Sequence, residues 1–463
     1  MSNLSTYCLF YFTICTFHTN AFIPHPLLAD GGLTSDSITH ADITELAFIR
    51  SLARFFYETR IVSNNRNGGS MKEQDYFNKE YTIDELYKLA HPEYNDAQVE
   101  LYSYPLKFTL DLVMTHNALV DFDPDTRKLS AAHFDSEAFS NGSRRILQLR
   151  KKIVEDSRNP KKDLTDARQM IGKLLHTLQD FYSHSNWVEM GNIDINTLIG
   201  HSETIGQVAA PNQATCSDTG CTKKTQDCNL WQKITIRKCP LVYYDCSNNI
   251  LSTINTQQIL TSGYLFNQST ENNEIISKPA NIGKCSHGSV MDESSHVPAI
   301  GGINKDSNSL IFSPHSNLHF QAVSFAINAT ERFLNDLRQE IGNDNFDRLF
   351  IVHPTEAIAQ QVSDAVAQGQ RFRFFSPYLK ASLKKSNSFI TDIKNSVKSA
   401  YNKVKSFFSN IFSKNKINIP TYDLSDLVAN IKDTNNVRAG PYILADQSIG
   451  RKKRLINTLH QHR

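Results

Sequence analysis

The sequence of 463 residues lacks long internal apolar runs, a strong net charge and any nucleotide-binding loop. Because a transmembrane helix needs about 18 or more consecutive apolar residues, no internal segment is expected to cross a membrane. The formal net charge of +2 argues against nucleic-acid binding by the whole protein surface. No internal repeat is present. The hydrophobic share of 40% and the charged share of 21% instead indicate a globular protein with a sizeable core.

The first residues have the composition of a secretory signal peptide. Tyr7 to Phe17 form an apolar run that is too short for a membrane anchor, and the small residue Ala21 suits a cleavage position. The chain's own amine is the only positive charge before this run. We therefore expect residues 1–21 to be removed during secretion, which leaves Phe22 at the N-terminus of an extracellular protein.

Cysteine spacing favours disulfide bonds over a zinc knuckle. No Cys-x-x-Cys pair occurs, and removal of residues 1–21 leaves six cysteines within about 70 residues. An even number of clustered cysteines in an exported chain predicts up to three disulfide bonds, whose pairing the sequence leaves open. Sequons fit the same secretory route and predict a glycoprotein. The cysteines are Cys216, Cys221, Cys228, Cys239, Cys246 and Cys285, and the sequons begin at Asn141, Asn267 and Asn328.

One stretch near the middle of the chain carries two histidines and an aspartate at helical spacing. Apolar residues at steps of three and four predict an amphipathic helix whose buried stripe runs from Ile171 to Tyr182. His176, Asp180 and His184 align on another face, since residues four apart lie one turn above each other. Zinc prefers imidazole and carboxylate ligands, and a carboxylate between two histidines can bridge two ions. The alternative is a solvated polar face, which this motif alone does not exclude.

Periodicity elsewhere predicts a mainly α-helical chain with one irregular insertion. A capping-box-like sequence places His40 in the first turn of a helix. His315 and His319 are expected one turn apart on a helix that begins just after Pro314. Residues 190–300, rich in Asn, Ser, Thr and Cys, predict a cross-linked insertion with short strands. Helices are expected over 40–56, 83–119 with breaks at Pro92 and Pro105, 136–155, 163–182 and 315–342, with a loop over 61–80.

Several motifs that are far apart in the chain together point to a known family. They are Thr39-His40-Ala-Asp-Ile-Thr-Glu, Asn117-Ala-Leu-Val-Asp121, Ala132-His133-Phe-Asp, His176-Thr-Leu-Gln-Asp180-Phe-Tyr-Ser-His184-Ser-Asn-Trp, Gly283-Lys-Cys-Ser-His, Gly302-Ile-Asn-Lys-Asp306 and Ser313-Pro-His-Ser-Asn-Leu-His319. In these motifs the chain, from about residue 22 to 350, resembles the N-terminal domain of von Willebrand A domain-containing protein seven. The same block is similar to the fungal Het-C domain and, more distantly, to bacterial zinc-dependent phospholipase C and fungal zinc nucleases. No von Willebrand A domain is expected, because the Asp-x-Ser-x-Ser motif is missing.

The resemblance implies a mainly α, zinc-dependent phospholipase C/nuclease-like helical domain over 22–350. This domain would contain a disulfide-rich, partly β insertion at 190–300 and would hold up to three Zn²⁺ ions. One ion is implied at Asp121, His133, His176 and Asp180, a second at His40, Asp180 and the mature N-terminal amine of Phe22, and a third at His184, His315 and His319. His287 and Asp292 are expected to hydrogen-bond to ligands rather than to bind metal.

The chain departs from the enzymes of that group at three places. Three residues separate Asp180 from His184, where the enzymes have five that include a proline. The mature chain would begin with Phe22, where the enzymes begin with Trp. His315 and His319 stand where the phospholipase has His and Glu, and replacing a carboxylate by an imidazole makes the site more positive and favours an anion.

The composition changes again over residues 351–463. Between Tyr378 and Lys416 an apolar helical stripe runs beside faces with nine Lys and one Asp. A basic amphipathic helix of this kind can lie peripherally on an anionic membrane, although the stripe could equally pack on the main domain or on a partner helix. The remaining residues 417–463 include the basic sequence Arg451–Arg454, which suits proprotein processing, and we expect them to be poorly ordered.

The resemblance implies a secreted, zinc-dependent phosphodiester hydrolase, either phospholipase C-like or nuclease-like. Zinc would bind a phosphate oxygen and lower the pKa of a water molecule, while Asp180 bridges two ions and Asp121 orients the attacking hydroxide. The substrate would be a phospholipid or a nucleic acid. The alternative is a non-catalytic extracellular interaction module on the same scaffold. A third interpretation, a membrane-perturbing protein, depends on the basic tail alone, and the sequence carries no signal for the oligomeric state.

Overall fold

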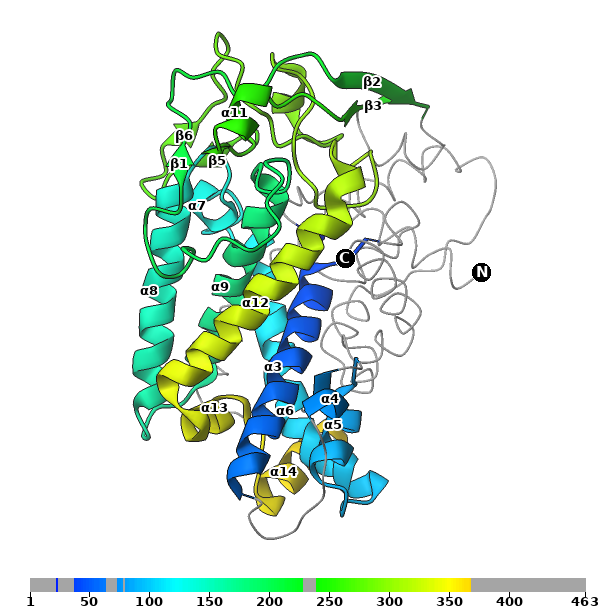
Figure 1. Ribbon diagram of the computed structural model, residues 1–463, viewed down its shortest axis with the longest axis vertical. Helices are drawn as coiled ribbons and strands as arrows, with labels where there is room; N and C mark the ends of the chain where they lie inside the picture. Colours follow the sequence, from blue (N-terminus) through cyan, green and yellow to red (C-terminus); the bar gives the residue numbers. More distant parts are fainter. Residues whose placement is uncertain (1–21, 24–36, 64–72, 78–79, 228–238, 368–463) are drawn as a thin grey trace, which may run out of the picture. The chain divides into compact units, whose positions relative to one another are not determined.

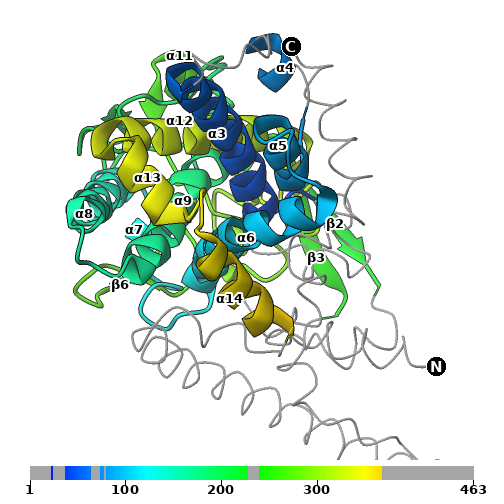
Figure 2. The ribbon, with the colours of Figure 1, turned by 90° about the horizontal axis from the view of Figure 1, so that it is seen from below.

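The computed structural model describes residues 22–23, 37–63, 73–77, 80–227 and 239–367. Within these ranges, five long helices form the core, which confirms the mainly α prediction (Figure 1). Helix α9 contacts the other four, and Figure 2 shows it enclosed by them. The five are α3 (His40–Ser63), α6 (Asp96–Ala118), α8 (Phe139–Arg158), α9 (Thr165–His184) and α12 (His319–Ile341).

Shorter elements join or extend these helices. The short helices are α4 (Glu73–Phe77), α5 (Ile83–Ala90), η1 (Leu119–Asp121), α7 (Ser130–His133), α11 (Ser252–Thr256), η2 (Glu293–His296), η3 (Ser316–Leu318) and α13 (Asn343–Phe350). Short strands pair two by two: β1 (Gln207–Val208) is parallel to β4 (Ile259–Leu260), β2 (Cys221–Gln226) is antiparallel to β3 (Leu241–Cys246), and β5 (Gln268–Ser269) is antiparallel to β6 (Ile275–Ile276). Helix α14 (Glu356–Ala367) belongs to a second unit of the chain, which begins at Pro354.

Helix α9 is buried on its apolar and on its polar face. Its predicted stripe, from Ile171 to Tyr182, lies in the core. His176, Asp180 and His184 also have no exposed surface. The alternative of a solvated polar face is therefore wrong. Because buried polar groups need partners, the surroundings of these three side chains decide what they can do.

Helices α6 and α9 approach each other closely at Gly172. A Cβ atom at this position would lie 2.3 Å from the backbone oxygen of Val113 and 2.8 Å from the backbone nitrogen of Asn117. Only a residue without a side chain allows this contact between the two backbones. The contact places Asn117, at the end of α6, beside the turn of α9 that carries His176.

The predicted break at Pro92 is present, whereas the predicted break at Pro105 is wrong. Helix α5 ends at Ala90, and Asn95 caps the start of α6 through a capping box with Gln98. Helix α6 then continues through Pro105 without interruption. Proline removes one backbone hydrogen bond from a helix interior. Here the neighbouring turns are buried against the core, and Leu106 has no exposed surface, so packing outweighs the lost hydrogen bond.

Helix α8 begins later than predicted, at Phe139 instead of residue 136. Ser136 and Glu137 have φ angles of +54° and +59°, which right-handed helices do not allow. Each is fixed by contacts with distant residues: the backbone nitrogen of Ser136 donates to Gly263, and that of Glu137 donates to the Ser262 hydroxyl. Long-range contacts therefore override the local helical pattern.

The last long helix also begins later than predicted, at His319 instead of His315. Pro314 and His315 precede it and lead into the 3₁₀ turn η3. The backbone nitrogen of His315 donates to the carbonyl of Asn304, and the side chain of Asn304 accepts from the Ser313 hydroxyl. These bonds hold residues 313–315 in a turn that precedes η3.

The insertion is irregular and cross-linked, as expected. Two disulfide bonds join Cys216 to Cys285 and Cys221 to Cys246. The predicted strand around Leu241 is present as β3. Cys228, which would contribute to a third bond, lies outside the described residues.

Several predictions fall on parts of the chain that the structure does not describe. The signal peptide at 1–21, the amphipathic segment 378–416 and the tail 417–463 all lie outside the described ranges. No described helix combines the length and the apolar character that a membrane span requires.

We predict that Gly172→Ala destabilises the fold by about 2–3 kcal/mol, because the added methyl group overlaps backbone atoms of α6. Urea unfolding at neutral pH measures this change. The matched control is Ser140→Ala on the exposed face of α8, which should stay within about 0.5 kcal/mol of the wild type. Equal stability of Gly172→Ala and the wild type would contradict the close approach of the two helices.

Candidate metal centre

Four predicted ligands meet beside the middle of α9, in what we call the first cluster. Asp121 comes from η1, His133 from the end of α7, and His176 and Asp180 from α9. All four are buried. Asp180 Oδ2 lies 3.0 Å from both His133 Nδ1 and His176 Nε2, and these two nitrogens are 3.1 Å apart. Asp121 Oδ1 is 3.9 Å from His133 Nδ1 and 3.7 Å from His176 Nε2.

These separations suit a tetrahedral metal site. Donor atoms at about 2.0–2.1 Å from a zinc ion stand about 3.3–3.4 Å apart along the edges of a tetrahedron. The separations within the first cluster, from 3.0 to 3.9 Å, bracket that value. Two nitrogens and two carboxylate oxygens are also ligand types that zinc accepts.

The other oxygen of Asp180 faces a separate histidine. Asp180 Oδ1 is 3.1 Å from His40 Nε2, yet neither atom makes a hydrogen bond within the described residues. Phe22 lies beside His40, with ring centroids 5.5 Å apart, and the His40 backbone nitrogen donates to the Ile23 carbonyl. The residues predicted for the second ion are therefore close together, and the His40 ring stacks on that of His176 with ring centroids 4.3 Å apart.

Hydrogen bonds fix which nitrogen of each imidazole faces the cluster. An imidazole that donates its N–H to an oxygen on one side presents a lone pair on the other. Each of the three histidines has an oxygen acceptor on its outer nitrogen, so the inner nitrogen offers a lone pair. The outer contacts are His40 Nδ1 to Gln179 Oε1 at 2.6 Å, His176 Nδ1 to Asn117 Oδ1 at 3.2 Å, and His133 Nε2 to the Thr126 carbonyl at 3.2 Å.

The two amides that orient His40 and His176 are themselves anchored. Asn117 Nδ2 donates to Gln179 Oε1 and to the hydroxyl of Thr44, while Gln179 Nε2 donates to the hydroxyls of Thr44 and Thr330. These contacts determine which end of each amide is the oxygen. The orientation of the imidazoles is thus set by α3, α6, α9 and α12 together.

Burial keeps the imidazoles around Asp180 neutral. It lowers the pKa of His40 and of His133 to about 3 and the pKa of His176 well below its usual value. Burial also raises the pKa of Asp180 well above the usual value of an aspartate. A neutral imidazole is the form that binds metal. Without a cation, lone pairs of nitrogen and oxygen face one another in a site closed to water.

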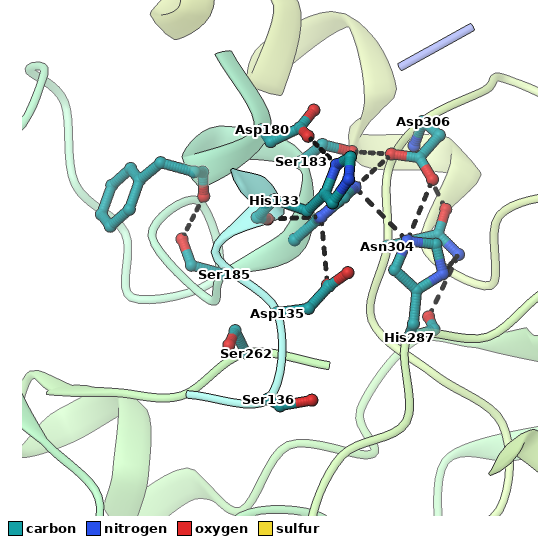
Figure 3. Close-up of polar contacts among 12 residues, drawn as sticks. His133, Asp135, Ser136, Asp180, Ser183, Ser185, Ser262, His287, Asn304 and Asp306 are labelled. Carbon is teal, nitrogen blue, oxygen red and sulfur yellow. Dashed lines mark hydrogen bonds and ion pairs between the residues drawn. The ribbon is translucent and has the colours of Figure 1, made fainter. Parts of the chain in front are cut away.

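A second cluster surrounds His184, one helical turn beyond Asp180. His184 Nε2 lies 3.0 Å from Asp306 Oδ1 and 3.3 Å from His287 Nε2, and His287 Nε2 lies 3.3 Å from Asp306 Oδ2. In Figure 3, Asp306 lies between Ser183 and His287. Asp135 contacts the other nitrogen of His184, Nδ1. The Nδ1 atoms of His184 and His287 are 2.8 and 3.1 Å from the carbonyls of His133 and Gly288, which directs both Nε2 atoms inward.

The second cluster is more strongly charged than the first. Burial lowers the pKa of His184, but the nearby carboxylates of Asp135 and Asp306 outweigh burial and raise it well above the usual value. The pKa of His287 is raised in the same way, again against the effect of burial. Burial acts to raise the pKa of Asp306, yet the two histidines hold it well below its usual value. The second cluster therefore either holds protons as ion pairs or exchanges them for a metal ion.

The structure does not bring His315 and His319 to His184. His315 Nδ1 lies 2.6 Å from Glu189 Oε1, and its Nε2 lies 2.8 Å from Asn249 Oδ1. His319 Nδ1 donates to the Lys305 carbonyl at 2.7 Å, and its Nε2 accepts from the backbone nitrogen of Ile38 at 3.0 Å. Both nitrogens of each ring are thus engaged by other groups, and His319 connects the start of α3 to the segment before Asp306.

Three residues of the second cluster were not predicted as ligands. His287 was expected to support a ligand, and Asp135 and Asp306 were given no role. All three belong to the motifs on which the resemblance rests. Membership in these motifs is the signal in the sequence that points to them as ligands. Asp292, paired with His287 in the sequence interpretation, instead caps η2 by accepting from the backbone of Ser294.

The described part of the chain encloses both clusters. A cavity of about 820 Å³ opens elsewhere, between α8 and α12, and its lining includes Arg150, His201 and Asp336 but none of the cluster residues. His40, His133, His176 and Asp180 have no exposed surface, while Asp306 retains a little. A substrate would therefore need a movement of surrounding segments to reach the first cluster.

Comparison with known proteins identifies relatives of this chain. Its sequence matches the family described as the VWA7 N-terminal domain over residues 88–244 and 231–347. It is 30% identical to von Willebrand factor A domain-containing protein 7 of Homo sapiens, Mus musculus and Rattus norvegicus. Each alignment covers 76% of this chain and 34% of the relative, so the chain spans about a third of the length of these curated relatives. No solved structure matches significantly.

We predict that the metal-free chain loses stability as the pH falls from about 6.5 to 4. The pKa of His40 and of His133 is about 3 in the folded chain, against an ordinary value of 6.5. Below pH 6.5 the unfolded chain binds protons that the folded chain does not, so each such histidine lowers the free energy of unfolding by about 1 kcal/mol per pH unit. The raised pKa values of Asp180, Glu137 and Glu331 act in the opposite sense, but burial also lowers the pKa of His116, His176 and His319, so the lowered histidines outnumber the raised acids.

The measurement is the urea midpoint of the chelator-treated chain at several pH values. His133→Asn should give a flatter curve, and the control His201→Asn, at the surface, should reproduce the slope of the wild type. A midpoint that is constant over this range would show that these imidazoles are not held neutral.

Proposed function

Since the chain belongs to the VWA7 N-terminal domain family, and that family name assigns no chemistry, we propose a function from its two clusters: a zinc-dependent phosphodiester hydrolase with more than one metal ion. The supporting observation is the position of Asp180. Its Oδ2 faces His133 and His176, and its Oδ1 faces His40. A carboxylate placed between two sets of imidazole lone pairs is typical of a bridge between two ions.

The residues divide into three binding groups. Asp121, His133, His176 and Asp180 Oδ2 would hold one ion, and Asp180 Oδ1 with His40 would hold a neighbouring one. His184, His287 and Asp306 would hold a further ion one turn away along α9. A single structural ion would need only one of these groups, so the presence of all three favours catalysis.

Bound zinc would supply Lewis acidity toward a phosphate oxygen and would lower the pKa of a water molecule. The chain contributes the orientation of its own groups. Asp121 Oδ1, 3.9 Å from His133 Nδ1 and 3.7 Å from His176 Nε2, would orient the attacking water beside the same ion. Asn117 and Gln179 hold the imidazoles in a fixed tautomer, so no reorientation is required during the reaction.

The substrate class follows from the same chemistry. Adjacent cations favour an anionic phosphate whose two ester bonds leave one negative charge, as in phospholipids and nucleic acids. We propose an extracellular location, because the two disulfide bonds of the insertion form and persist in oxidising compartments.

The burial of the ligands favours a second candidate function. Structural metal sites are closed, whereas catalytic sites keep one position open to water. His40, His133, His176 and Asp180 are all fully enclosed. A non-catalytic extracellular module that uses its metal ions for stability would have the same enclosed clusters.

Zinc content and turnover together distinguish the two candidates. We expect elemental analysis of the secreted chain to find more than one zinc ion per molecule. We also expect chelator-sensitive hydrolysis of phosphatidylcholine vesicles or of a single-stranded oligonucleotide. Asp180→Asn should lower that hydrolysis by about two orders of magnitude or more, because it removes the shared carboxylate.

The matched control is Asp336→Asn, a similar change beside the remote cavity, which should retain both zinc and activity. Circular dichroism should give the same helical content for both variants. Stoichiometric zinc without hydrolysis of either substrate would establish the non-catalytic module, and absence of zinc from the wild type would rule out both candidates.

A further inference from the structure

We propose that Asp135 is a positioning residue that connects the two clusters, by holding His184 in the orientation in which it binds metal. This proposal rests on the metal binding proposed above, and it adds a role for a residue that is not itself one of the proposed ligands. The argument starts from the segment His133–Asp135, because this short segment touches both clusters.

The side chain of Asp135 contacts the outer nitrogen of His184. Asp135 Oδ1 lies 3.1 Å from His184 Nδ1, the nitrogen that faces away from His287 and Asp306. Both side chains are fully buried. A carboxylate in this position keeps the proton on Nδ1, so Nε2 presents its lone pair to the metal, and it also makes the imidazole a stronger donor.

The backbone of the same segment supports this orientation. The carbonyl of His133 accepts from His184 Nδ1 at 2.8 Å, while the His133 ring belongs to the first cluster through its contact with Asp180. One residue therefore binds in the first cluster with its side chain and orients the second with its carbonyl. Asp135, two residues later, supplies the charge on the same side of His184.

Asp135 is in turn held from the insertion. Gln268 Nε2 donates to Asp135 Oδ2, and the Ser136 hydroxyl donates to Gln268 Oε1. Asp135 Oδ1 has no hydrogen bond of its own within the described residues, which leaves it available to His184. The Gln268 amide thus fixes Oδ2 of Asp135, while Oδ1 faces the His184 imidazole.

An unusual backbone course makes this arrangement possible. Phe134, Ser136 and Glu137 have φ angles of +54°, +54° and +59°, a left-handed conformation that non-glycine residues rarely adopt. The buried ion pair between Glu137 and Lys284, at 2.7 Å, holds the end of this segment. Strained backbone that persists between two polar clusters is typical of a functional site rather than of an ordinary loop.

The geometry also separates the role of Asp135 from that of Asp306. Asp306 contacts the Nε2 atoms of both histidines, which is the position of a ligand. Asp135 contacts Nδ1 of His184, and the two nitrogens of an imidazole point in divergent directions. Removal of the two carboxylates should therefore have different effects on metal binding.

Metal titration of three variants tests the proposal without reference to activity. The chelator-treated chain is titrated with Zn²⁺ in competition with a chromophoric chelator, and Co²⁺ spectra report the geometry of the site. Asp135→Asn should weaken the ion of the second cluster by about 10–100-fold and leave the ions of the first cluster in place. Asp306→Asn should abolish the second-cluster ion. Gln268→Ala, which only loosens Asp135, should weaken the same ion to a smaller extent.

Each other outcome has a defined meaning. Unchanged affinity in Asp135→Asn overturns the proposal, and so does complete loss of the ion to the same extent as in Asp306→Asn, because Asp135 would then be a ligand. If Asp135→Asn does not fold, Gln268→Ala decides in the same way. A wild-type chain without bound metal overturns this proposal together with the proposed function. A chain that binds zinc with the predicted variant effects but hydrolyses no phosphodiester overturns only the hydrolase.

Discussion

The enclosure of Asp180 among three imidazoles is the interaction on which the rest of the structure depends. A buried carboxylate costs several kcal/mol unless a counter-charge or hydrogen-bond donors compensate for it. The inner nitrogens of His40, His133 and His176 cannot compensate, because hydrogen bonds on their outer sides leave lone pairs facing inward. A proton on Asp180 reduces this cost, in agreement with its raised pKa. A divalent cation would reduce it further, because it would satisfy the nitrogens as well as the carboxylate.

The helical frame serves to hold those lone pairs in place. The backbone contact at Gly172 brings the end of α6 against α9, and this sets the distance from Asn117 to His176. Gln179 lies beside Asp180 on α9, and its amide is fixed by hydroxyls from α3 and α12. Each inward nitrogen thus depends on a contact between helices rather than on its own helix alone. The same contacts between helices therefore stabilise the bundle and set the geometry of the first cluster, so a change in helix packing would alter the site.

The first cluster could be predicted from sequence because its key spacing is local. His176 and Asp180 are four residues apart on one helix, and the resemblance supplied Asp121 and His133, which the structure places beside them.

The second cluster could not be predicted in the same way. Its residues His287 and Asp306 are 103 and 122 positions beyond His184, on irregular segments whose course depends on long-range bonds. The regular spacing of His315 and His319 was misleading, because α12 begins only at His319. The prediction of a break at Pro105 is wrong because helix packing outweighs local propensity there.

The two clusters therefore depend on different parts of the structure. The first is built almost wholly from helices, whereas the second depends on the cross-linked insertion. Cys285 lies two residues before His287 and is bonded to Cys216. A Cβ atom at Gly301 would lie 2.4–2.5 Å from both sulfurs of the Cys221–Cys246 bond, and one at Gly302 would lie 2.3 Å from the His287 carbonyl. The loop that leads to Asp306 is therefore packed directly on one disulfide and on the segment held by the other. Helix packing positions most of the first cluster, whereas the second depends also on the course of the insertion, and the segment His133–Asp135, which is bonded to Ser262 and Gly263 through the next two residues, contacts both clusters.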